Sequence, residues 1–185
     1  MGTKPIRIAL VAMLATTALV AATSAAAKTV PLSGTQTTIN EKKGIYKMHG
    51  SLRGRWYGLS FVPQAKSPSQ LVAIGRERFV GCLDSNRNTV CDAAEPAGTI
   101  NFTYTAWFSL NPSTKAFVRG QCLHPVTGGT GAFADARGVV TMVDTPVGKT
   151  IQTTYKGLLT YGPTAADRIP TSARPGDEAE ARSTC

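Results

Sequence analysis

Short segments that alternate between apolar and polar residues dominate the chain from Arg55 to Tyr161. In residues 99–108, every second side chain is apolar or aromatic, and the residues between them are mostly Thr and Asn. This alternation is typical of a strand with one buried face. Similar β-branched or aromatic runs, separated by turn sequences, occupy residues 55–62, 71–75, 116–123, 139–143 and 151–161. No long stretch carries the 3.6-residue apolar stripe of a helix, so the sequence predicts an all-β protein.

The spacing of these runs predicts how the strands are arranged. Seven or eight short strands about ten residues apart are typical of an antiparallel barrel or sandwich. Closure into a barrel removes the exposed strand edges that invite aggregation. The 185 residues suffice for one domain. We therefore expect a small antiparallel β-barrel of about eight strands.

The N-terminus has the pattern of a secretory signal peptide. Lys4 and Arg7 precede an apolar run over residues 8–20, and small residues follow up to Ala27. The alternative, a membrane anchor, is disfavoured because the run is mostly Ala and Thr rather than Leu, Ile and Val. We expect cleavage of residues 1–27, a secreted or periplasmic location, and no membrane span in the mature protein.

Composition divides the remaining chain into three parts. Residues 28–43 are rich in Thr, Ser and Gly and are expected to form a loose leader. Residues 44–161 contain most of the strand patterns and are expected to form the barrel. Residues 162–185 hold three prolines and no aromatic residue, so we expect a disordered tail.

The positive charge of the chain does not indicate a nucleic-acid partner. Lys and Arg number 20 against 11 Asp and Glu, which gives a formal net charge of +9. These charges are scattered, with one loose cluster at Lys42, Lys43 and Lys47, and no recognition motif accompanies them. We expect a solvated basic surface.

A glycine-rich segment at residues 126–138 permits two interpretations. Its Thr-Gly-Gly-Thr-Gly sequence is similar to the phosphate-binding turn of a dinucleotide-binding unit. That unit needs a buried parallel strand before the turn and a helix after it, whereas residues 119–125 do not read as a buried parallel strand and a β-branched run follows Gly138. The context therefore predicts no bound cofactor.

The same segment resembles the motif G-G-[ST]-G-x-F-x-x-A-x-G of the allene oxide cyclase and dirigent families. All fixed positions match, namely Gly128, Gly129, Thr130, Gly131, Phe133, Ala136 and Gly138. The resemblance implies a small eight-stranded barrel, commonly trimeric, whose lumen holds a small apolar molecule. The residue types suit a tight corner, because glycines permit positive φ and Phe133 can plug the barrel end.

Candidate catalytic residues are few. Arg137 is the one motif position that could steer a reactive intermediate, as the resemblance implies for a cyclase. His124 could take part in acid–base chemistry, although a structural hydrogen bond is the more common role of a histidine at a strand end. No hydrolase motif is present. We therefore expect a structural or small-ligand-binding module rather than an enzyme, with a cyclase-like isomerase or dirigent-like protein as the alternative.

Residues 84–95 have the ligand spacing of a calcium loop. The candidate ligands at positions 1, 3, 5, 7, 9 and 12 are Asp84, Asn86, Asn88, Val90, Asp92 and Glu95. Thr89 occupies the position where such a loop usually has glycine, and the flanking segments are strands rather than helices. The alternative is a turn rich in Asp and Asn that needs no ion. No cofactor is required by either interpretation.

Four cysteines are consistent with export. Cys82 and Cys91 flank the candidate calcium loop, and a disulfide between them would stabilise the fold by about 2 to 3 kcal/mol. The sequence leaves open how Cys122 and Cys185 pair. Zinc is not expected, because no C-x-x-C motif occurs.

Overall fold

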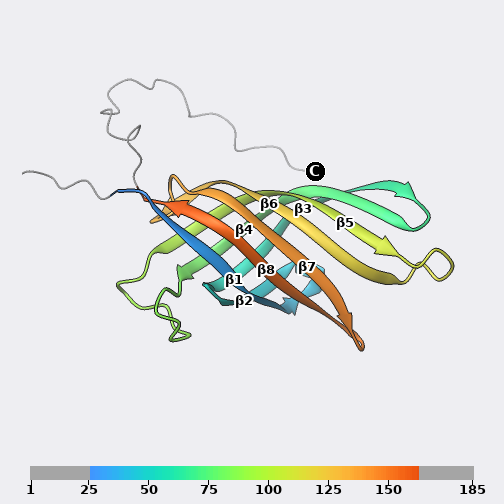
Figure 1. The fold of residues 1–185 in the computed structure, drawn as a ribbon, viewed down its shortest axis with the longest axis horizontal. Coiled ribbons are helices and arrows are strands. Elements are labelled where there is room, and N and C mark those ends of the chain that lie inside the picture. The colour runs from blue at the N-terminus through green and yellow to red at the C-terminus, as the bar shows by residue number, and fades with distance from the viewer. Residues whose placement is uncertain (1–25, 163–185) are drawn as a thin grey trace, which may run out of the picture.

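The computed structural model describes residues 26–162, apart from the side chains of residues 65 and 66. These residues form a closed barrel of eight antiparallel strands in chain order (Figure 1), which confirms the predicted fold class. Within this range, no helix has the length and apolar character needed to cross a membrane. The signal peptide, apart from its last two residues, and the tail beyond Gly162 lie outside the described residues.

Each strand pairs with the next along the chain, and the last strand pairs with the first. A short 3₁₀ helix, η1 (Glu41–Lys43), joins the first two strands. The strands are β1 (Lys28–Asn40), β2 (Ile45–Gly50), β3 (Leu52–Ser67), β4 (Gln70–Leu83), β5 (Ala97–Leu110), β6 (Phe117–Gly131), β7 (Arg137–Val147) and β8 (Thr150–Tyr161).

The prediction of a loose leader at residues 28–43 is wrong. This segment forms β1 and η1, and β1 pairs with both β2 and β8. The composition of this segment was misleading because most of its outward positions are Thr or Ser. Leu32 enters the core, whereas Gly34 occupies an inward position where a large apolar residue would have indicated a strand. A Cβ on Gly34 would collide with the His49 carbonyl oxygen and with Tyr155. The barrel therefore begins at Lys28 and not at residue 44.

The barrel has two different ends. The β4–β5 loop, the β6–β7 turn and both ends of the described chain lie together at the left of Figure 1. We call this the closed end, because the inward side chains of this half are fully packed. Trp56 stacks on Phe102 with 4.5 Å between ring centroids, and Leu52, Met48, Phe79, Ile100 and Leu159 are completely buried.

Phe133 lies in the turn between β6 and β7, within the glycine-rich motif. Its side chain is completely buried and lies 5.9 Å from the Tyr161 ring, between ring centroids. The turn needs glycine where the backbone has positive φ, as at Gly131 with a φ of 63°. At Gly138, a Cβ would lie 2.0 Å from the Leu158 carbonyl oxygen. The motif thus forms a tight corner that places an aromatic ring in the closed end.

We predict that Phe133→Ala lowers the free energy of unfolding by about 3 to 5 kcal/mol, because it leaves a cavity in a packed interior. Val118→Ala is the matched control, since Val118 is half exposed on the outer wall of β6. Urea unfolding followed by tryptophan fluorescence measures both. A loss for Phe133→Ala no larger than that of the control would contradict a packed closed end.

Candidate functional site

Inward side chains become exposed toward the opposite end of the barrel. There, four short connections join β1 to β2, β3 to β4, β5 to β6, and β7 to β8; we call this the open end. On β7, the inward residues Val140 and Met142 are buried, whereas the next inward residue, Asp144, is partly exposed. On β8, Tyr155 is buried and Thr153 is partly exposed. Solvent therefore reaches the interior from the open end.

Polar side chains gather in the lumen between the packed half and the open end. Glu77 Oε2 and His124 Nε2 lie 2.8 Å apart, although they come from β4 and β6, which are not neighbouring strands. The Glu77 side chain is 16% exposed, whereas that of His124 is 2% exposed. We use the name lumen cluster for six residues: Tyr46, Glu77, Tyr104, Cys122, His124 and Asp144.

His124 is surrounded by aromatic rings. Its ring lies 5.5 Å from Trp56, 5.7 Å from Tyr104 and 6.3 Å from Phe102, measured between centroids. The contact with Glu77 is close, yet Glu77 Oε2 is buried without a hydrogen-bond partner among the described residues. His124 Nδ1 and Trp56 Nε1 are buried without a partner in the described residues. Such unpaired polar atoms are uncommon in protein interiors.

Burial and the charges of two carboxylates together raise pKa values in the lumen cluster. Burial raises the pKa of Tyr104 to about 12, and the charge of Glu77 adds to the shift. Burial, followed by the charges of Glu77, Glu41 and Asp144, raises the pKa of Tyr46. The Cys122 thiol has a raised pKa because of burial, with contributions from Asp144 and Glu77. The two carboxylates are thus close enough to influence the same interior groups.

Asp144 itself lies in a partly desolvated position. Burial raises the pKa of Asp144, while the hydrogen bond from Thr153 Oγ1, at 2.6 Å, opposes this shift. Cys122 makes no disulfide with any described residue, and Cys185 lies outside the described range. The cluster therefore contains two carboxyl groups, an imidazole, a thiol and two phenols.

Sequence reasoning found only part of this cluster. His124 lies within it, whereas Arg137, the other candidate catalytic residue, is exposed at the start of β7 near the closed end. Glu77 and Asp144 were missed as lumen residues. The signal for Glu77 was its place on the same alternating face as Ala73 and Phe79, which are both completely buried. An acid on an apolar strand face is unusual, and the pattern could have been used to find it.

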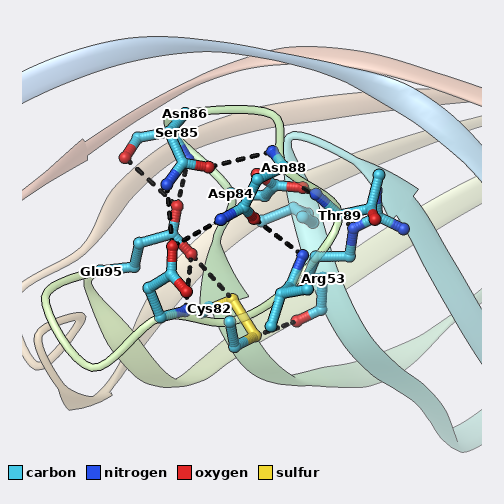
Figure 2. Close-up of a disulfide and its surroundings, with 12 residues drawn as sticks. Arg53, Cys82, Asp84, Ser85, Asn86, Asn88, Thr89 and Glu95 are labelled. Carbon is cyan, nitrogen blue, oxygen red and sulfur yellow. Dashed lines mark hydrogen bonds and ion pairs between the residues drawn. A yellow bond between two sulfur atoms is a disulfide. The ribbon is translucent and has the colours of Figure 1, made fainter.

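The predicted disulfide between Cys82 and Cys91 is confirmed. It joins the end of β4 to the β4–β5 loop, beside the predicted calcium ligands (Figure 2). Asp84 Oδ2 accepts hydrogen bonds from Arg53 Nε and the Thr89 N–H, both at 3.0 Å. The bridge is consistent with an oxidising compartment.

The other predicted ligands also bond within the loop. Glu95 accepts hydrogen bonds from the backbone N–H groups of Ser85 at 2.8 Å and Asp92 at 3.2 Å. Asp92 Oδ2 accepts from the side-chain amides of Asn86 and Asn88, at 2.9 and 2.6 Å. Val90 is exposed, and its N–H donates to Asn88 Oδ1. The loop is a hydrogen-bonded network built on Asp and Asn side chains.

As placed, these residues do not fit a calcium ion. Asp84 Oδ1 is a buried oxygen without a partner, but Arg53 already supplies a positive charge to the same carboxylate. Asn86 and Asn88 turn their amide nitrogens, not their oxygens, toward Asp92. Within residues 26–162, no group of three or more His, Cys, Asp or Glu side chains is placed so that it could hold a metal ion. Calcium binding stays a prediction, which melting curves in millimolar calcium and in chelator would measure.

No protein-family model, curated protein or solved structure matches the chain. The relationship to the allene oxide cyclase and dirigent families therefore stays a prediction from residues 128–138. The finding that stands is the closed eight-stranded antiparallel barrel.

We predict that Asp84 makes stability depend on acid pH. Burial favours its neutral form, but the hydrogen bonds from Arg53 and Thr89 and the Arg53 charge outweigh burial and lower the pKa of Asp84. A lowered folded-state pKa contributes stability above the unfolded value of about 3.9, and this contribution is lost as pH falls through the folded pKa.

Asp84→Asn should therefore melt at a lower temperature than the wild type at pH 7. The difference should shrink as pH falls below about 4. Melting curves from pH 7 to pH 2.5 measure this, with Asp135→Asn, an exposed acid in the β6–β7 turn, as control. A difference that stays constant over this range would contradict the assignment.

Proposed function

We propose that this protein is a small-ligand-binding barrel that holds a mainly apolar molecule in the open half of its lumen. The observation that carries the proposal is the exposure of inward side chains toward the open end, above a fully packed aromatic half. Ligand sites are typically concave, mostly apolar, and equipped with a few polar groups that orient the ligand. The lumen cluster supplies such groups.

The walls around the open half support an apolar ligand. Phe108 packs against the core and lies 6.4 Å from Phe61 and 6.1 Å from Phe117, between ring centroids. Phe61 is half exposed and pairs with Gly75 on the inward face of β4. These rings offer apolar surface near the open end, Asp144 offers an acceptor at the level of Phe108, and Glu77 offers one deeper in the lumen.

Location and assembly form a further part of the proposal. The disulfide and the predicted signal peptide support a secreted or periplasmic protein. The resemblance of residues 128–138 supports a homo-oligomer, with a trimer as the expected state. The outer wall is consistent with this state, because it exposes the large apolar side chains of Val62, Ile74, Trp107, Leu123, Val139 and Leu158.

The contact between Glu77 and His124 favours a second candidate function, a cyclase-like isomerase. A carboxylate next to an imidazole in a partly desolvated site can gain and lose a proton during a reaction. Glu77 is the more exposed member and would face the substrate, with His124 behind it. Turnover would then be lost in Glu77→Gln while an uncharged ligand still binds, whereas a binding module has no turnover to lose.

We predict that Gln36→Trp blocks the lumen. Gln36 pairs with Met48 and Thr153 on the inward face, so a large side chain there would occupy the open half. Binding of the uncharged probe 4-phenylbutan-1-ol, measured by saturation-transfer NMR and calorimetry, should fall at least about tenfold, since one buried aromatic ring is worth more than 1.4 kcal/mol.

Thr154→Trp is the matched control, because Thr154 is exposed on the outer face of β8 next to β1. This variant should bind the probe like the wild type. Equal binding by both variants would place the probe outside the lumen. Absence of binding to the wild type would leave a purely structural barrel.

A further inference from the structure

We propose that the lumen selects ligands with a positively charged head, such as a protonated amine attached to an apolar body. The inference rests on the proposed ligand-binding function and adds the chemical class of the ligand. It follows from the balance of charges in the lumen cluster and from the interior polar atoms that lack partners.

The lumen contains more negative than positive groups. Glu77 and Asp144 contribute two carboxyl groups, whereas His124 is the single basic side chain of the cluster and can balance only one of them. Within the described residues, the two salt bridges are Arg53 to Asp84 and His124 to Glu77, so no Lys or Arg pairs with either lumen carboxyl group. A cationic ligand would supply the missing charge.

Unpaired interior atoms provide an independent indication that the site is incomplete. Glu77 Oε2 is buried and accepts no hydrogen bond from the described residues, and His124, which is 2% exposed, leaves its Nδ1 without a partner among them. The N–H groups of a protonated amine could donate to the Glu77 carboxylate and so satisfy its unpaired oxygen. The cluster therefore has the character of a site that is balanced only when a ligand is bound.

The surrounding rings suit an organic cation. A cation within about 6 Å of an aromatic face is attracted by the ring, by up to about 2 kcal/mol when water is excluded. The Tyr104 ring lies 5.7 Å from the His124 ring, between centroids, and His124 contacts Glu77 at 2.8 Å, so an aromatic ring lies near the carboxylate. A carboxylate combined with aromatic rings is an arrangement that recognises amines, whereas it repels carboxylic acids.

The basic surface of the chain does not reverse this preference. Lys42, Lys43 and Lys149 lie at the open end, but all three are exposed to solvent. Salt screens exposed charges over about 8 Å at physiological ionic strength, while buried charges are screened much less. The lumen carboxylates should therefore decide which ligand binds, and the lysines should affect mainly the approach at low salt.

Three probes with the same apolar body and different heads test the proposal: 4-phenylbutylamine, 4-phenylbutan-1-ol and 4-phenylbutyrate. Calorimetry at pH 7 and physiological salt should show the amine binding at least about tenfold more tightly than the acid, a difference of about 1.4 kcal/mol. The alcohol should lie between them. In Glu77→Gln, the amine should lose most of its advantage over the alcohol.

Asp135→Asn is the matched control, since it removes one exposed acid outside the lumen and should leave all three affinities unchanged. Asp144→Asn provides a second lumen variant if Glu77→Gln does not fold. Equal affinity for the amine and the acid, or an unchanged amine preference in the folded lumen variant, would overturn the proposal while leaving ligand binding intact. Failure of all three probes to bind would overturn both.

Discussion

Pairing of the first strand with the last is the constraint on which the rest of the structure depends. β1 and β8 are paired from Lys28 with Tyr161 to Gln36 with Thr153, which closes the sheet on itself. Closure leaves no free edge, and it gives the sheet an inside where side chains from distant parts of the chain can meet. Without it, Glu77 on β4 and His124 on β6 would lie on one face of an open, solvated sheet.

A closed interior must be packed with apolar side chains for stability, but complete burial of titratable groups is costly. The barrel meets both requirements by packing one half and leaving the other half partly exposed. The half near the closed end is filled by rings and aliphatic side chains and supplies most of the apolar burial. The other half keeps titratable groups that would be costly to bury completely. His124 lies at the boundary, with Trp56 and Phe102 on its packed side and Glu77 on its wetter side.

The sequence predicted what depends on local pattern and missed what depends on closure. The alternation of apolar and polar residues identified most strands. The short separation between Cys82 and Cys91 identified their disulfide. β1 was missed because Gly34 interrupts its apolar inward face, and this glycine fits only against Tyr155 from the far end of the chain. The contact between Glu77 and His124 could not be predicted either, because it crosses the lumen between β4 and β6, which are not paired with each other.

The plugged end has a consequence for exchange. Because Phe133 and its packed neighbours fill one end, a ligand of the proposed kind would have to enter and leave through the open end. Passage straight through the barrel is ruled out, and two molecules cannot follow one another in file. The residence time of such a ligand would then depend only on how quickly it leaves through that end.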